Sequence, residues 1–178
     1  MSYADTLDRI LAGDFDDATE EQRARAVREL ITVCSAATAA AALQPVPFLD
    51  LAVSGPVQIA MVQGIGRIHG YELNRQSVLE ILSTFGASIL AKQAVIGGMR
   101  FVPVFGSLVG VGMAWAMTWA IGEVADHYFA CGRGVPPHEL RSMLKRVYKE
   151  KRAEARRNGG PPTEPQAPTG DCDSHPSM

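Results

Sequence analysis

Apolar residues recur at helical spacing through most of the chain. Near the C-terminus, Leu140, Leu144, Val147 and Tyr148 follow one another at intervals of four, three and one, which places them on one face of a helix. Start and stop signals divide the pattern into six expected helices. Their expected ranges are residues 2–13, 19–43, 48–69, 77–96, 103–131 and 136–157. The pattern therefore predicts an all-α fold.

Particular residues mark where several of these helices begin and end. Thr19 and Gln22 fit a capping box, in which each side chain satisfies a backbone N–H of the other residue. Asn74 is expected to cap the fourth helix. Gly70 can take the left-handed conformation that ends a helix. Pro56 lies inside the third helix and removes a backbone donor, so we expect a kink or a late start there.

An internal repeat relates the two halves of the middle of the chain. When the sequence is shifted by 56 residues, residues 46–70 lie over 102–126 and seven of 25 positions match. Each half reads as helix, proline turn, helix, with the turns at Pro47 and Pro103. We therefore expect a duplicated helical hairpin, flanked by a short N-terminal helix and a basic C-terminal helix. Compositional chance is the alternative explanation.

Charge divides the chain into four segments. An acidic N-terminal segment covers residues 1–24, and a nearly uncharged hairpin core covers 25–134. A basic amphipathic helix is expected over 135–157, followed by a Pro-, Thr- and Gly-rich tail over 158–178 that we expect to be disordered. Residues 101–122 contain no charged residue, and a segment of this length is long enough to cross a bilayer.

Composition removes several classes of protein. The chain has 178 residues, about one domain, and its 47% apolar content is too high for a disordered protein. Three cysteines form neither a disulfide framework nor a structural zinc pair. The net charge of −2 argues against a general polyanion binder. The acidic first residues do not resemble a signal peptide, and free thiols favour a cytosolic face.

Small residues recur every four positions along the fifth expected helix. Such a row lets another helix backbone approach closely, in a membrane or in a soluble core. The corresponding row in the first half is more polar and includes Asp50 and Gln58, which we expect to hydrogen-bond to the opposing hairpin. Capping of the third helix is the alternative role for Asp50. The row consists of Gly106, Gly110, Ala114, Thr118 and Gly122.

The segment Pro45-Val46-Pro47-Phe48-Leu49-Asp50, followed by Gln58, Met61 and Gly70, resembles the opening of the YcjF-like domain of unknown function. Pro103-Val104-Phe105-Gly106 and Tyr128-Phe129 resemble the second signature of that family. The resemblance covers about residues 25–132. It implies a membrane-associated helical domain that is often linked to Era-like GTPases. This chain has no GxxxxGK[ST] loop, so any GTPase would be a separate protein partner.

Residues that carry chemistry are few. Glu123 and His127 are spaced for one helical face, but two ligands do not make a metal site, and a contact at the helix end is the expected role. Cys131 has no base nearby that the sequence reveals. We therefore expect no catalytic residues, no metal and no cofactor, and we expect the protein not to be an enzyme.

Three functions remain open. The first is a module at the cytoplasmic membrane that contacts lipid and acts through partners, with its charged segments facing the cytoplasm. The second is a soluble cytoplasmic interaction protein, for example a homo-oligomer. The third is an enzyme or ligand carrier with an apolar pocket. Residues 103–122 are the best spanning candidate, whereas 32–43 extend only about 18 Å.

The basic helix admits three interpretations. Its apolar stripe packs on the core, or the stripe and the surrounding bases lie on an anionic membrane. Nucleic acid is the least favoured partner, because no aromatic residues are interleaved with the bases. The bases expected at the membrane surface are Lys145, Arg146, Lys149, Lys151 and Arg152.

Overall fold

The computed structural model describes residues 15, 17–43, 49–83 and 107–160, without the side chains of 49–51 and 107–109. Four long helices are α2 (Glu20–Leu43), α3 (Leu49–Ile68), α5 (Ser107–Ala130) and α6 (Pro137–Arg157). A further helical stretch covers residues 75–83. Every regular element in these ranges is helical, so the predicted all-α fold is confirmed.

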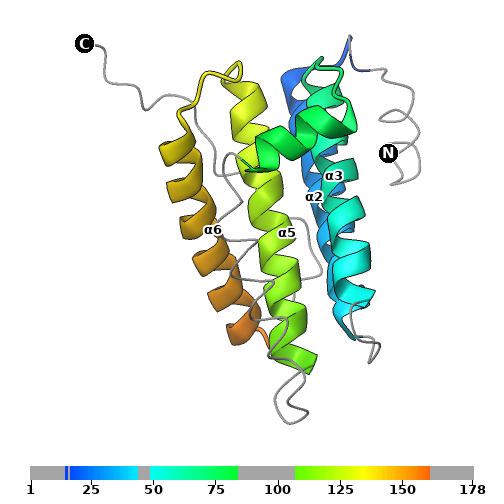
Figure 1. Ribbon diagram of the computed structural model, residues 1–178, viewed down its shortest axis with the longest axis vertical. Coiled ribbons are helices and arrows are strands. Elements are labelled where there is room, and N and C mark those ends of the chain that lie inside the picture. The colour runs from blue at the N-terminus through cyan, green and yellow to red at the C-terminus, as the bar shows by residue number, and fades with distance from the viewer. Residues whose placement is uncertain (1–14, 16, 44–48, 84–106, 161–178) are drawn as a thin grey trace.

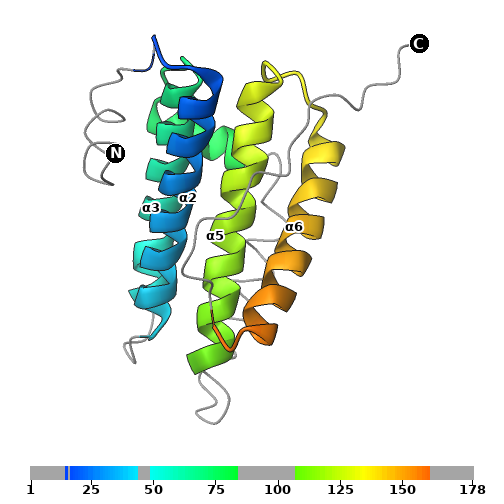
Figure 2. The same ribbon diagram turned by 180° about the vertical axis from the view of Figure 1, so that it is seen from behind.

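The helices form a bundle around α5. α5 contacts α2 and α3 on one side and α6 on the other, and α2 also contacts α3 (Figures 1 and 2). α2 and α6 run from one end of the bundle to the other, and α3 and α5 run back. The side chains of residues 115–122 are all buried. This part of the stretch that we expected to span a membrane is therefore covered by the chain's own helices.

The helix ends follow the predicted signals. The Thr19 backbone N–H donates to Gln22 Oε1 at 3.0 Å and the Gln22 N–H donates to Thr19 Oγ1 at 3.3 Å, which confirms the capping box. The Ser77 N–H donates to Asn74 Oδ1 at 2.7 Å, so Asn74 is the expected cap. α3 begins seven residues before Pro56, so the helix does not start late, and the alternative of a kink at Pro56 stays a prediction.

Two helices end in the same hydrogen-bonded motif. Gly70 has a φ of 80°, and Gly132 has a φ of 66°. After each of these glycines, the next residue donates its N–H to a carbonyl five positions back, from Tyr71 to Gly66 and from Arg133 to Tyr128. These bonds are those of the Schellman motif, which satisfies carbonyls at the end of a helix. The left-handed conformation expected at Gly70 is therefore confirmed.

Small residues allow α5 to approach its neighbours closely. Gly110, Thr118 and Gly122 are buried and Ala114 is half-buried. A Cβ placed on Gly122 would lie 2.5 Å from Ile31 Cγ1 of α2, so the two helices have no room for one there. The packed face of α5 thus depends on the absence of a side chain at Gly122.

Several expectations lie outside the described residues. They are the N-terminal helix, the proline turns at Pro45, Pro47 and Pro103, the rest of the fourth helix, Gly106, and the tail from residue 161. One arm of the second hairpin is among them, so the duplicated hairpin stays a prediction.

We predict that Gly122→Ala destabilises the bundle, by about 1–3 kcal/mol before an offset of up to about 1 kcal/mol from the higher helix propensity of Ala. The matched control is Gly55→Ala in α3, where a Cβ meets nothing within 4 Å. This control is expected to be neutral or stabilising by up to about 1 kcal/mol. Urea unfolding followed by circular dichroism measures both. Equal effects of the two substitutions would contradict the close contact at Gly122.

Candidate functional site

A seam of polar side chains crosses the apolar core where α2, α3 and α5 meet. Gln58 Nε2 of α3 donates to Thr118 Oγ1 of α5 at 3.2 Å. Thr118 Oγ1 lies 3.0 Å from Thr38 Oγ1 of α2, and Thr38 Oγ1 donates to the Ser35 carbonyl at 3.0 Å. The side chains of Thr38 and Thr118 are fully buried. We call Gln58, Thr118, Thr38 and Ser35 the polar seam.

The proton positions in the polar seam follow from donor counting. Thr38 has one hydroxyl proton, and that proton goes to the Ser35 carbonyl. Thr118 must therefore donate its own proton to Thr38, while its oxygen accepts from Gln58. The result is a one-directional chain of hydrogen bonds from α3 through α5 to α2, in which each bond polarises the next.

The polar seam has an energetic cost as well as a gain. The Ser35 side-chain oxygen is buried and has no hydrogen-bond partner among the described residues. An unsatisfied buried hydroxyl is unfavourable by about 1–3 kcal/mol. The seam therefore favours one particular alignment of the three helices more than it adds net stability.

Of the residues expected to dock the hairpins, the structure brings Gln58 and Thr118 into direct contact. Gly122 lies against Ile31 of α2, and Gly110 and Ala114 lie on the same helix as Thr118. The side chain of Asp50 and all of Gly106 lie outside the described residues, so their docking roles stay predictions.

A second polar cluster joins α5 to α6. Trp119 Nε1 donates to Glu123 Oε1 at 2.5 Å on the same helix. Lys151 Nζ of α6 lies 5.0 Å from the centroid of the Trp119 ring and 3.2 Å from Glu154 Oε2. Burial raises the pKa of the Glu123 carboxyl, and the Trp119 hydrogen bond and the Lys151 ammonium act against that rise.

Lys151 corrects one sequence-based expectation. It was expected at the membrane surface, yet only 7% of the residue is exposed, and its ammonium group packs over an aromatic ring beside a carboxylate. A cation held over a Trp ring is stabilised by the ring's negative face. Its spacing from Leu140, Leu144 and Val147 places Lys151 on the buried face of the helix, and this signal was overlooked.

The rest of α6 has a buried apolar stripe and an exposed basic surface. Leu140, Leu144 and Val147 are buried, and α6 contacts only α5 among the described long helices. The interpretation in which this stripe packs on the core therefore describes the structure, and the one in which it lies on the bilayer is wrong for this state. Lys145, Arg146 and Lys149 are exposed, and Arg152 is partly exposed.

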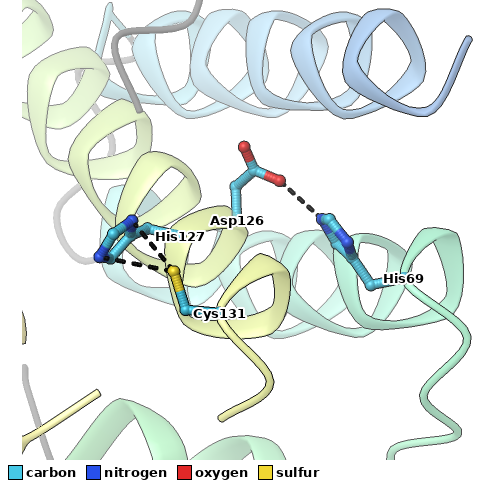
Figure 3. Close-up of polar contacts among 4 residues, drawn as sticks. All are labelled: His69, Asp126, His127 and Cys131. Atoms are coloured by element: carbon cyan, nitrogen blue, oxygen red, sulfur yellow. Dashed lines mark hydrogen bonds and ion pairs between the residues drawn. The ribbon is translucent and has the colours of Figure 1, made fainter. Parts of the chain in front are cut away.

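A side-chain hydrogen bond links the ends of α3 and α5. His69 Nε2 lies 2.7 Å from Asp126 Oδ1, and Figure 3 shows the Asp126 carboxylate turned toward His69. His69 directly follows the last residue of α3, where a histidine commonly interacts with the dipole of its own helix. It instead joins two helices, at the end of the bundle where Tyr71 and Phe129 also meet.

The structure also brings a base close to Cys131. The Cys131 sulfur lies 3.8 Å from His127 Nδ1 and 4.0 Å from Nε2, a contact that the spacing of four residues makes possible (Figure 3). The two nearly equal distances mean that neither ring nitrogen points at the sulfur. Asp126 contacts His69 rather than His127, so these four residues do not form a nucleophile, base and carboxylate chain.

No group of three or more metal-ligating residues occurs in the part of the chain that the structure describes. Glu123 accepts its hydrogen bond from Trp119, and His127 lies against Cys131. Burial raises the pKa of the remaining described thiol, Cys34, to about 11, so that thiol is neutral near pH 7.

These contacts define the class of protein, an all-α bundle whose central helix makes polar contacts with three neighbours. The chain belongs to the family described as "Domain of unknown function (DUF697)", whose model matches residues 8–123. This membership agrees with the YcjF-like resemblance. No curated protein and no solved structure matches the chain. The family description assigns no activity, so function has to be argued from the residues.

We predict that Gln58 and Thr118 are energetically coupled. In a double-mutant cycle of Gln58→Leu and Thr118→Val, the coupling should be about 1 kcal/mol, because each substitution removes the same hydrogen bond. The unfolding free energies of the four proteins provide the measurement. Additive effects would mean that the seam does not align the helices. The Asp50→Ala and Gln58→Leu pair tests the remaining docking residue in the same way.

We also predict a pH dependence that arises from Glu123. Its folded-state pKa is raised above the unfolded value, so the folded state binds the proton more tightly. The corresponding stability is present below the unfolded pKa, about 4.3, and is lost as pH rises through the folded pKa. Between these pH values, wild-type stability should fall relative to Glu123→Gln. Urea unfolding across this range provides the measurement, and parallel stability curves for wild type and Glu123→Gln would contradict the prediction.

Proposed function

We propose that this protein is a membrane-associated helical module that acts through protein partners. The observation that carries the proposal is the half of the α2–α3 hairpin where α2 ends and α3 begins. α2 has no charged residue from 31 to 43, and α3 has none from 51 to 66. The two helices lie side by side, so one end of the hairpin presents a long surface without charge.

This uncharged half is also apolar on its outside. On α2, Val33 is 36% exposed and Leu43 is 57% exposed, both large apolar side chains in contact with solvent. We call the whole set of outward apolar residues the hairpin patch. Its exposed members are Val33, Ala36, Ala37, Ala40, Leu43, Ala52, Pro56 and Ala60. Exposed apolar residues on both helices favour contact with lipid or with another protein.

The length of α2 is consistent with membrane contact. Among the described residues, α2 is the one helix long and apolar enough to cross a bilayer, and 44% of that window is buried. A core helix passes the same test, so α2 gives weak support by itself. Arg25 lies near the start of α2, Arg67 lies in the last turn of α3, and Arg75 follows seven residues after α3 ends. The start of α2 and the end of α3 lie together at the other end of the bundle, where the positive-inside rule favours the cytoplasm.

The partner belongs to the proposal as well. The YcjF-like resemblance suggests a separate Era-like GTPase, which this chain would hold at the cytoplasmic membrane. The competing function is a soluble protein in which a second copy covers the hairpin patch. Both functions use the same surface, so one substitution on that surface addresses them together.

We predict that Ala40→Asp lowers binding of the full chain to lipid vesicles by about tenfold, since a charge in an apolar lipid contact is unfavourable by more than 1 kcal/mol. Ala130→Asp is the control, because Ala130 is exposed at the opposite end of the bundle. Vesicle co-sedimentation and light scattering measure both variants. A wild-type protein that is dimeric, ignores vesicles and becomes monomeric on Ala40→Asp would support the soluble function instead.

A further inference from the structure

The C-terminal turns of α6 lie level with the end of the hairpin where α2 ends and α3 begins. A Cβ placed on Gly112 would lie 3.3 Å from Ala155 Cβ, so Ala155 of α6 and Gly112 of α5 are at the same height along the bundle. Thr118 contacts Thr38, so Thr38 of α2 and Thr118 of α5 are also at one height along the bundle. Gly112 precedes Thr118 by about 9 Å of helix, and Leu43 follows Thr38 by about 7.5 Å. Ala155 and Leu43 are therefore at nearly the same height in the bundle.

The charges on α6 are segregated around the helix axis. At 100° per residue, one flank of the buried stripe contains five bases and no acid. The other flank contains all three acids of the helix, Glu139, Glu150 and Glu154, together with Arg146 and Arg157. We call the first set the basic flank, and its members are Arg141, Lys145, Lys149, Arg152 and Arg156.

This arrangement limits how deeply the end of the bundle can enter a bilayer. Arg156 lies one residue from Ala155, so it is at the height of the exposed Leu43 side chain. A base in the hydrocarbon core is strongly unfavourable, whereas a base at the phosphate level is attracted to anionic lipid. Shallow insertion is favourable for both the hairpin patch and the basic flank, because the apolar residues reach the acyl boundary while the bases stay at the headgroups.

We propose that this end of the bundle binds the interface of an anionic lipid leaflet without spanning it. The hairpin patch contacts the acyl boundary, and Lys149, Arg152 and Arg156 of the basic flank bind lipid phosphates. This inference rests on the proposed membrane association and adds the lipid class, the depth and the binding end. Apolar residues and bases at one height fit a lipid interface, which offers hydrocarbon and phosphate together, better than they fit nucleic acid.

Charge neutralisation at two ends of the full chain tests the inference. Deleting α6 is unsuitable because that helix covers α5. The test variant is Lys149→Gln, Arg152→Gln and Arg156→Gln, the three exposed or partly exposed bases that the proposal places at the lipid phosphates. The control variant is Arg25→Gln, Arg67→Gln and Arg75→Gln, which are also exposed and remove the same charge toward the other end.

The probes are vesicles of phosphatidylcholine alone and of phosphatidylcholine mixed with phosphatidylglycerol. Wild type should bind the anionic vesicles more tightly, and salt and alkaline carbonate should release it. Each base near the surface contributes about fivefold, so the test variant should lose on the order of 100-fold in affinity for the anionic vesicles, and the control should lose little.

The outcomes separate this inference from the proposed function. Equal binding to both vesicles, equal losses for the two variants, or retention in carbonate would overturn interfacial binding to anionic lipid, although the membrane association would stand. Failure of wild type to bind either vesicle would overturn the membrane association too. Tighter binding of the basic flank to duplex DNA than to anionic vesicles would assign that flank to nucleic acid.

Discussion

The bundle depends on how closely α2 approaches α5. At Gly122 the two helices leave no space for a Cβ, because Ile31 occupies it. Four residues earlier on α5, Thr118 Oγ1 lies 3.0 Å from Thr38 Oγ1, so a wider separation of the two helices would break this hydrogen bond. Dispersion falls steeply with distance, so a small outward shift of α2 would weaken packing along both helices. The small residues of α5 thus permit the contact, and the polar seam fixes its alignment.

The polar seam and the Trp119 cluster have a similar role on opposite sides of α5. Gln58 and Thr38 reach α5 from the hairpin, and Lys151 reaches it from α6. Burying a polar group in an apolar core is unfavourable unless the group has a hydrogen-bond or charge partner. These groups therefore disfavour every alignment of the helices except the one in which they are paired. Apolar packing alone tolerates small slides of one helix along another, and these contacts do not. Each neighbour of α5 therefore has its own polar contact that selects its position.

Helix ends were predictable from the sequence because they depend on local chemistry. The Thr19 capping box and the left-handed Gly70 involve residues within five positions of one another, so the sequence alone contains the whole interaction. The burial of Lys151 was readable from its spacing along α6, but its partner Trp119 was not, because Trp119 lies 32 positions away on another helix. The link between His69 and Asp126 was missed for the same reason. Only the three-dimensional packing decides which polar residues become buried partners.

The burial of Lys151 also limits how α6 can meet a membrane. The apolar stripe of α6 faces α5, and moving it onto lipid would break the contacts of Lys151 with Trp119 and Glu154. A lysine removed from these partners is not stabilised by an apolar acyl layer. The docked helix therefore offers lipid only its flanks, and just one flank is free of acids. Because the apolar contact must come from elsewhere, it comes from the hairpin patch, and the two surfaces meet a bilayer at the same end of the bundle.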